Sequence, residues 1–165
     1  MKIEFELNGK SKSLEIEPRE TLAEVLRARC RLTGVKLSCE AQVCGSCTVL
    51  VDALPVSACT YLAYEIRNKR VTTIEGMADG AGRLHPLQQA FLDHFAFQCG
   101  FCTPGMILAA KSLLDENAHP SDEEIIAYMS GNLCRCTGYL GILKAIRQAS
   151  AELREHTAGS RRNRE

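Results

Sequence analysis

The 165-residue sequence contains no tryptophan, and aromatic residues make up only 5% of it. Scarce aromatics argue against the stacking platforms on which single-stranded nucleic acids bind. Twenty Lys and Arg balance twenty Asp and Glu, so the formal net charge is zero. A neutral chain has no overall field to attract nucleic acid or an anionic membrane surface. We therefore expect no nucleic-acid partner.

Long hydrophobic runs are also missing. No stretch approaches the roughly 20 apolar residues that a helix needs to cross a bilayer. The first six residues, MKIEFE, alternate in charge and lack the apolar segment of a secretory signal. The sequence therefore predicts no membrane span and a cytoplasmic location.

Cysteine, by contrast, is abundant, with nine residues in the chain. In a secreted protein such a number would suggest a disulfide framework. Here the number is odd and no export signal is present, so the compartment is expected to be reducing. Metal binding is the leading interpretation.

The first half of the chain has the pattern of a small α+β domain. Residues 2–7 and 10–16 alternate in polarity around Asn8-Gly9, a strong hairpin signal. Thr21 and Glu24 form a capping box for a helix that carries Leu22, Val25, Leu26 and Arg29. Further strands are expected at 48–51, around Val56 after a connection through 52–55, and at 71–74. We expect this domain to span residues 1–76.

The second half has helical periodicity. Three glycines between 75 and 83 mark a connection, and we place the linker at 77–83. Four helices are expected: one from Pro86 through His94 and Phe95, one opening at Thr103, one from Ser121 to Gly131, and one reaching Leu153. Short connections between them indicate a four-helix bundle over 84–156, followed by a disordered polar tail at 157–165.

The first cysteine group consists of Cys39, Cys44, Cys47 and Cys59, in a C-x4-C-x2-C run with a fourth cysteine after eleven residues. This spacing is typical of plant-type ferredoxins, whose loop wraps three thiolates around a [2Fe–2S] cluster. A zinc site is the alternative, but zinc modules usually show two pairs with similar spacing.

The second group consists of Cys99 and Cys102, between two expected helices, and Cys134 and Cys136, between the next two. An antiparallel bundle can bring both turns to one end, where helix N-termini after Thr103 and Thr137 would face an anionic cluster. Spacing alone favours an iron–sulfur cluster but leaves zinc and a redox dithiol open. Cys30 remains, and we interpret it as a buried hydrophobic side chain.

Three segments carry a resemblance to a known family: CGSCTVLVD at 44–52, QCGFCTPGM at 98–106 and GNLCRCTGY at 131–139. With these, nearly the whole chain resembles the small iron–sulfur subunit of the xanthine oxidase family of molybdenum hydroxylases. The chain departs from the family at Gln42, where glycine is frequent, and at Asp52-Ala53, where Asp-Gly is common.

The resemblance implies an N-terminal β-grasp [2Fe–2S] ferredoxin domain followed by a C-terminal four-helix-bundle [2Fe–2S] domain. It also implies a large partner subunit with molybdopterin cytosine dinucleotide and a medium subunit with FAD, as a dimer of heterotrimers. Gln98 and Cys136 would approach the pterin, with Cys136 also a cluster ligand. The chain would relay single electrons from molybdenum through both clusters to FAD or another acceptor.

Two other hypotheses compete with this electron-transfer subunit. The first is a free two-cluster ferredoxin, although such carriers are usually strongly acidic and this chain has no net charge. The second is a zinc-stabilised interaction module. Under all three hypotheses the chain itself holds no catalytic residue. Its histidines are expected on surfaces or helices.

Overall fold

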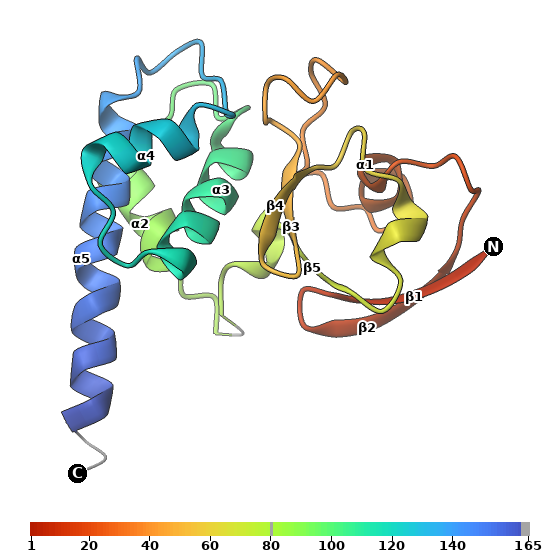
Figure 1. Cartoon of the computed structure of the whole chain (residues 1–165), viewed down its shortest axis with the longest axis horizontal. Coiled ribbons are helices and arrows are strands. Elements are labelled where there is room, and N and C mark those ends of the chain that lie inside the picture. Colours follow the sequence, from red (N-terminus) through yellow and green to blue (C-terminus); the bar gives the residue numbers. More distant parts are fainter. Residues whose placement is uncertain (80, 163–165) are drawn as a thin grey trace.

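The computed structural model describes residues 1–79 and 81–162, with the chain beyond Arg154 described as backbone only. Figure 1 shows two units side by side, a sheet with a short helix and a group of longer helices. This is the expected α+β arrangement of two domains. No helix in the described part of the chain is both long and apolar enough to span a membrane.

The first unit is built on a five-stranded sheet with strand order β2-β1-β5-β3-β4. Only β1 and β5 run parallel, whereas all other neighbours are antiparallel. The strands are β1 (Lys2–Leu7), β2 (Lys10–Glu15), β3 (Thr48–Val51), β4 (Leu54–Ser57) and β5 (Arg70–Thr72). The Asn8-Gly9 hairpin is confirmed, because both residues have positive φ, 50° and 76°.

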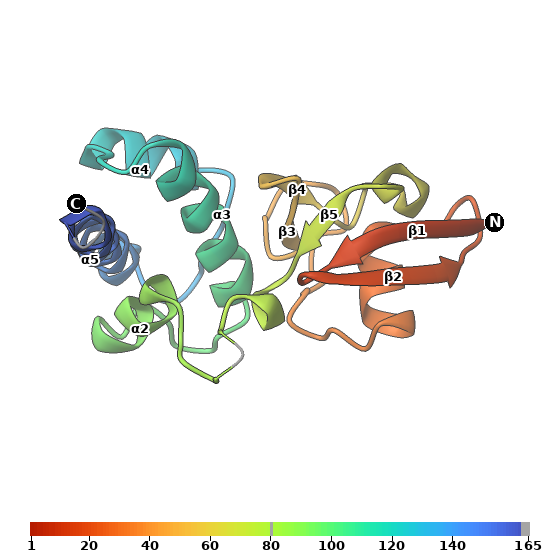
Figure 2. The same cartoon turned by 90° about the horizontal axis from the view of Figure 1, so that it is seen from below.

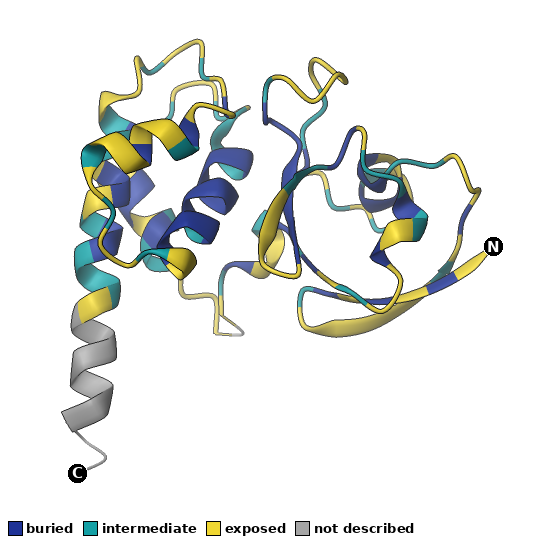
Figure 3. Ribbon diagram, in the orientation of Figure 1, coloured by how far each residue is buried: buried dark blue, intermediate teal, exposed yellow. Residues whose placement is uncertain are grey.

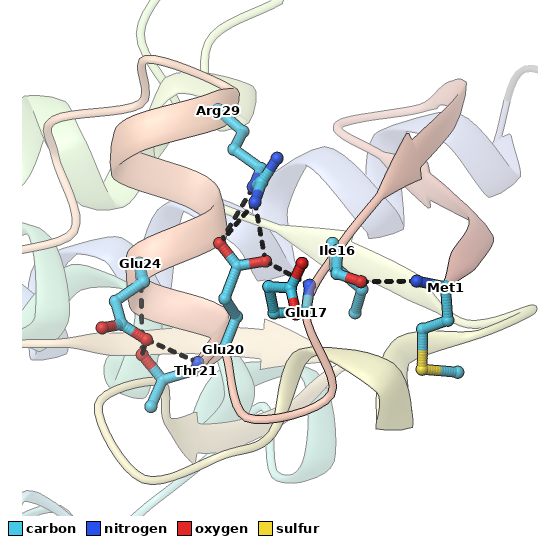
Figure 4. Close-up of polar contacts among 7 residues, drawn as sticks. All are labelled: Met1, Ile16, Glu17, Glu20, Thr21, Glu24 and Arg29. Carbon is cyan, nitrogen blue, oxygen red and sulfur yellow. Dashed lines mark hydrogen bonds and ion pairs between the residues drawn. The ribbon is translucent and has the colours of Figure 1, made fainter.

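Helix α1 (Leu22–Glu24) continues as a π-helical turn, Val25–Arg29, and packs over the sheet. Leu22, Val25 and Leu26 are fully buried, as their spacing predicts. The predicted capping box is present, since the Thr21 and Glu24 backbone amides are bonded reciprocally to each other's side chains (Figure 4).

Polar contacts fix the approach to α1. The Glu20 carboxylate accepts two bonds from the Arg29 guanidinium, both at 2.9 Å, and one from the Glu17 amide at 2.7 Å. The N-terminal amine of Met1 donates to the Ile16 carbonyl at 2.6 Å, so the chain start is held against the end of the hairpin (Figure 4). These contacts brace the chain between the hairpin and the helix that precedes the first cysteine loop.

Two strand boundaries differ from expectation. Strand β4 begins at Leu54, so the β3–β4 turn contains only Asp52 and Ala53, with φ of 49° and 70°. Pro55 is tolerated inside β4 because that strand lies at the sheet edge. Ile74, expected at the end of a strand, begins a short 3-10 helix instead.

The second unit contains α2 (Pro86–Asp93), α3 (Thr103–Glu116), α4 (Asp122–Met129) and α5 (Leu140–Arg162). Helix α3 is the central one, and Figure 3 shows it buried along most of its length. The predicted Ser121–Glu124 capping box is present at α4. His85 caps α2, its Nδ1 accepting from the Leu87 amide at 3.2 Å.

The helix ends differ from prediction at three places. Helix α2 stops at Asp93, because Phe95 adopts φ of 48° and the Phe95 and Ala96 amides bond back to Leu92 and Phe91. Phe95 is therefore 82% exposed and was wrongly predicted to lie on the helix. Helix α4 ends at Met129 rather than Gly131, and α5 continues to Arg162 through the expected tail of 157–165. Residues 163–165 lie outside the described residues.

The two units share part of their core. Leu50 of β3 and Met77, at the start of the expected linker, both belong to the core of the helical unit. Ile74 packs against this core. Figure 2 shows α3 facing the edge of the sheet where β3 and β4 lie. The Ser112 hydroxyl of α3 donates to the Ala53 carbonyl at 2.8 Å, and the Tyr128 hydroxyl bonds to Ser112 at 3.0 Å. The helices are thus docked on β3 and β4.

The Asp52-Ala53 turn makes a stability prediction. Alanine at positive φ is strained by its Cβ, and glycine is not. We expect Ala53→Gly to raise the free energy of unfolding of the full chain by about 0.5–1 kcal/mol, measured by urea denaturation. Ala118→Gly is the control, because Ala118 is an exposed loop residue without positive φ. This substitution should lower the free energy of unfolding slightly. A loss of stability in Ala53→Gly would contradict the strain.

Candidate metal centres

All nine cysteines lie within the described residues and carry free thiols. Eight of them gather in two places. The first is the loop between the π-helical turn and β3 together with the segment after β4. The second is one end of the helical unit, where the loops before α3 and before α5 meet.

The first cysteine loop folds its backbone around Cys39. The Cys39 Sγ accepts from the amides of Ala41, Val43 and Cys44, each at 3.4 Å. These three backbone bonds lower the pKa of the Cys39 thiol to about 6. Without any metal, this exposed sulfur is thus already surrounded by donors that favour a thiolate.

Gln42 lies in this loop at a position where the backbone favours glycine. Its φ is 59°, which accounts for the frequent glycine in the family that the sequence resembles. The Gln42 side chain has a contact of its own, because its Oε1 accepts from the Thr60 hydroxyl at 3.1 Å. Thr60 follows Cys59, so this bond ties the loop to the segment that supplies the fourth cysteine.

Cys47 and Cys59 form the inner part of the first group. Cys47 precedes β3 and is 3% exposed, whereas Cys59 follows β4 and is 9% exposed. Burial raises the pKa of the Cys47 thiol to about 12, and the neighbouring Cys59 side chain is in hydrogen-bonding contact with it. A thiol in this setting becomes a thiolate readily only when a cation replaces its proton.

In the second group the Cys99 and Cys136 sulfurs lie 3.6 Å apart, and both residues are exposed. Cys102 and Cys134 form a deeper pair in hydrogen-bonding contact, and burial raises the pKa of the Cys102 thiol to about 12. Helix α3 begins at Thr103 directly after Cys102, as predicted. Helix α5 begins at Leu140 and not after Thr137, because residues 134–139 form a loop around Cys134.

Cys134 is held from within its own loop. The Thr137 hydroxyl donates to the Cys134 Sγ at 3.2 Å, and the Cys134 amide donates to the Tyr139 hydroxyl at 2.8 Å. Burial opposes ionisation of this thiol, but the bonds from Thr137 outweigh it and lower the pKa of Cys134. The hydrogen bonds that Thr137, Tyr139 and Thr60 make were not identified from the sequence, because they depend on contacts that spacing does not reveal.

The sulfurs are therefore arranged two by two. We call Cys39–Cys44 and Cys99–Cys136 the outer pairs, and Cys47–Cys59 and Cys102–Cys134 the inner pairs. A disulfide would require about 2.05 Å between sulfurs, far less than 3.6 Å. Two sulfurs about 2.3 Å from one tetrahedral metal lie about 3.8 Å apart.

The paired arrangement separates the two metal hypotheses. A structural zinc needs four ligands around one point. Two irons bridged by sulfide instead take two thiolates each, which fits two pairs per site.

The Thr103 hydroxyl beside Cys102 is buried and has no partner within the described structure, so it is available to a cluster sulfur.

The two cysteine loops also contact each other. The Leu133 amide donates to the Cys44 carbonyl at 2.9 Å, and the Asn132 side chain donates to the Gly45 carbonyl at 2.9 Å. Leu133 directly precedes Cys134, so a single hydrogen bond connects the backbones of the two groups.

The remaining sequence candidates lie as follows. Gln98 is exposed beside Cys99 in the loop before α3. Cys30 ends the π-helical turn and packs against the core of the sheet unit, and burial raises the pKa of its thiol. It belongs to neither group of four, and it is half-buried rather than fully buried as expected.

Comparison with known proteins gives matches over most of the chain. A family model described as a 2Fe-2S iron-sulfur cluster binding domain matches residues 5–71, and one described as a [2Fe-2S] binding domain matches residues 73–147. The nicotine 6-hydroxylase small subunit of Paenarthrobacter nicotinovorans is 46% identical, covering 93% of this chain and 92% of that protein. The nicotinate dehydrogenase small FeS subunit of Eubacterium barkeri is 49% identical, covering 89% and 93%.

Two solved structures are similar as well. Quinoline 2-oxidoreductase from Pseudomonas putida superposes with a TM-score of 0.88 at 48% identity, covering 92% of this chain and 94% of that one. Aldehyde oxidoreductase from Desulfovibrio desulfuricans superposes with a TM-score of 0.89 at 43% identity and covers 93% of this chain. The match is only 17% of that longer polypeptide.

Thr137 and Thr60 make a matched test of the second group, since each follows a cysteine but only Thr137 bonds to a sulfur. A hydrogen bond to a ligand sulfur favours the reduced, more negative cluster. We expect Thr137→Val to lower the reduction potential of the second cluster by tens of millivolts, on the order expected for one lost hydrogen bond. Redox titration followed by paramagnetic resonance measures it. Thr60→Val should leave that potential unchanged, and an equal shift in both variants would contradict the assignment.

Proposed function

Because the chain belongs to the small iron–sulfur subunits of the xanthine oxidase family of molybdenum hydroxylases, we propose that it relays single electrons between partner subunits. It takes them from a molybdenum–pterin centre on a large subunit and passes them through two [2Fe–2S] clusters to FAD or another acceptor. The observation that carries this proposal is the presence of two paired four-thiol sites whose loops are joined by a hydrogen bond.

Each unit of the chain supplies one cluster. In the sheet unit, residues 1–76, the ligands are Cys39, Cys44, Cys47 and Cys59. In the helical unit, residues 84–156, they are Cys99, Cys102, Cys134 and Cys136. A [2Fe–2S] cluster with four thiolates is anionic and exchanges one electron at a time. The chain supplies what such a group needs, namely amide and hydroxyl donors at the sulfurs of Cys39 and Cys134.

The helical unit would face the large subunit. Its outer pair, Cys99 and Cys136, is exposed, and so is Gln98 beside it. Exposed apolar side chains surround these loops: Phe95, Phe101, Leu133, Tyr139 and Leu140. Apolar side chains gathered on a surface are a mark of protein contact. We therefore assign Gln98 and Cys136 to the approach of the pterin, with molybdopterin cytosine dinucleotide as its expected form.

The sheet unit would face the acceptor. Its outer pair contains the exposed Cys39, while Cys47 and Cys59 are buried behind it. Electrons would enter through the exposed pair of the helical unit and leave through the outer pair of the sheet unit, toward FAD on a medium subunit. The Leu133–Cys44 hydrogen bond lies between the two groups on this route.

A free ferredoxin is the weaker candidate. Zero net charge provides no long-range steering toward a transient partner. In the similar aldehyde oxidoreductase, the part that matches this chain is a fraction of a longer polypeptide, which places such a unit permanently beside the rest of an enzyme. We place the assembly in the cytoplasm, where a reducing environment keeps eight closely spaced thiols available for metal.

Iron analysis tests the ligand assignment. The full chain, reconstituted anaerobically with iron and sulfide, should hold about four irons and four acid-labile sulfides. Cys47→Ser and Cys102→Ser should each lower the iron content to about half, by removing one ligand of one cluster. Cys30→Ser is the matched control and should retain all four irons. A well-folded wild-type chain without labile sulfide would overturn the proposal.

Isolation from native cells tests the partners. The chain should migrate in size-exclusion chromatography with larger chains that contain molybdenum and FAD, at the size of a dimer of heterotrimers. Reduction of the isolated complex with its substrate should reduce both clusters before any external acceptor is added. Migration as a monomer without associated chains would favour the free ferredoxin instead.

A further inference from the structure

A buried side chain of the helical unit reaches into the first cysteine loop. Asn132 is 6% exposed, and its Nδ2 donates to the Gly45 carbonyl at 2.9 Å and lies 3.3 Å from the Thr48 Oγ1. The same Gly45 carbonyl also accepts from the Thr48 hydroxyl at 2.7 Å and from the Thr48 amide at 3.1 Å. One carbonyl oxygen is thus the common acceptor for donors from both units.

The backbone at Gly45 is enclosed by the helical unit on two sides. A Cβ added at Gly45, where φ is 66°, would lie 2.5 Å from both the Asn132 Nδ2 and the Gly131 carbonyl. On the other side, a Cβ added at Gly105 in the first turn of α3 would collide with the Gly45 carbonyl. Gly45 is therefore fixed by atoms that belong to the other unit.

This position matters because Gly45 lies between Cys44 of an outer pair and Cys47 of an inner pair. A shift of its backbone would change the spacing between the two pairs. The part of the loop that precedes Cys44 cannot resist such a shift by burial, since residues 38–43 are exposed. Close packing and hydrogen bonds across the unit boundary therefore add to the restraint that Thr48 provides within the sheet unit.

We propose that Asn132 is a positioning residue for the first cluster, in the sheet unit, although it lies two residues from Cys134 of the second. The inference rests on the proposed ligation of the two clusters. Cys134 does not need Asn132, because Thr137 and Tyr139 hold it from within its own loop. Loss of the Asn132 carboxamide would loosen Cys44 and Cys47 and leave the second cluster in place.

The test uses Asn132→Ala and the nearly isosteric Asn132→Asp, which replaces the donor by an acceptor. Each full-length variant is reconstituted with iron and sulfide, and the two clusters are followed by paramagnetic resonance after reduction with dithionite. We expect the first-cluster signal to be altered and to disappear roughly fivefold faster under an iron chelator, as for one lost hydrogen bond. The second-cluster signal should match the wild type.

Ser112→Ala is the matched control. Ser112 is 4% exposed and also joins the two units by a hydrogen bond, to the Ala53 carbonyl, but outside the cysteine loops. It should leave both clusters as in the wild type. Because the second-cluster signal reports a folded helical unit, circular dichroism is needed only to confirm the sheet unit.

Three results would overturn the inference: unchanged retention of the first cluster in both Asn132 variants, loss of the second cluster or of both together, or the same first-cluster loss in Ser112→Ala. If the wild-type chain itself binds no cluster, the proposed function fails as well, and iron analysis of the wild type distinguishes that case.

Discussion

Three of the four outer thiols, those of Cys39, Cys99 and Cys136, are exposed, so apolar burial cannot hold them in place, and hydrogen bonds must do so. Cys39 is surrounded by three backbone amides, and Cys99 lies against Cys136 where two loops meet. A hydrogen bond to a charged sulfur is stronger than one between neutral groups, so a thiolate or a cluster strengthens the same contacts that fold the loop. Loop geometry and metal binding thus stabilise each other.

The shared core explains how two different folds can act as one electron carrier. Leu50 of the sheet is buried among the helices, and α3 starts at the second cysteine group and lies along β3. Strand β3 in turn starts next to Cys47. Each cysteine group is therefore anchored to one of two elements that pack directly on each other. A rigid separation between redox centres follows from this packing, because close-packed interiors resist deformation.

Much of this arrangement could be predicted because its signals are local. Asn8-Gly9 predicted the hairpin, and Thr21 with Glu24 predicted the helix start, since each involves residues within a few positions. The cysteine spacings likewise predicted two groups of four. Phe95 misled the prediction, because its spacing is helical while its backbone is left-handed. The role of Asn132 could not be predicted, since its partner Gly45 lies 87 residues away.

Backbone strain marks the same loops. Gln42, Phe95 and Tyr139 all have positive φ, where a side chain costs energy that glycine would avoid. At Gln42 and Tyr139 the side chain makes a contact that glycine could not, to Thr60 and to the Cys134 amide. The Phe95 ring makes no comparable contact within the described structure and is 82% exposed. The Phe95 backbone ends helix α2, but the exposure of its ring is explained by a surface outside the chain, and Phe95 lies on the face assigned to the large subunit.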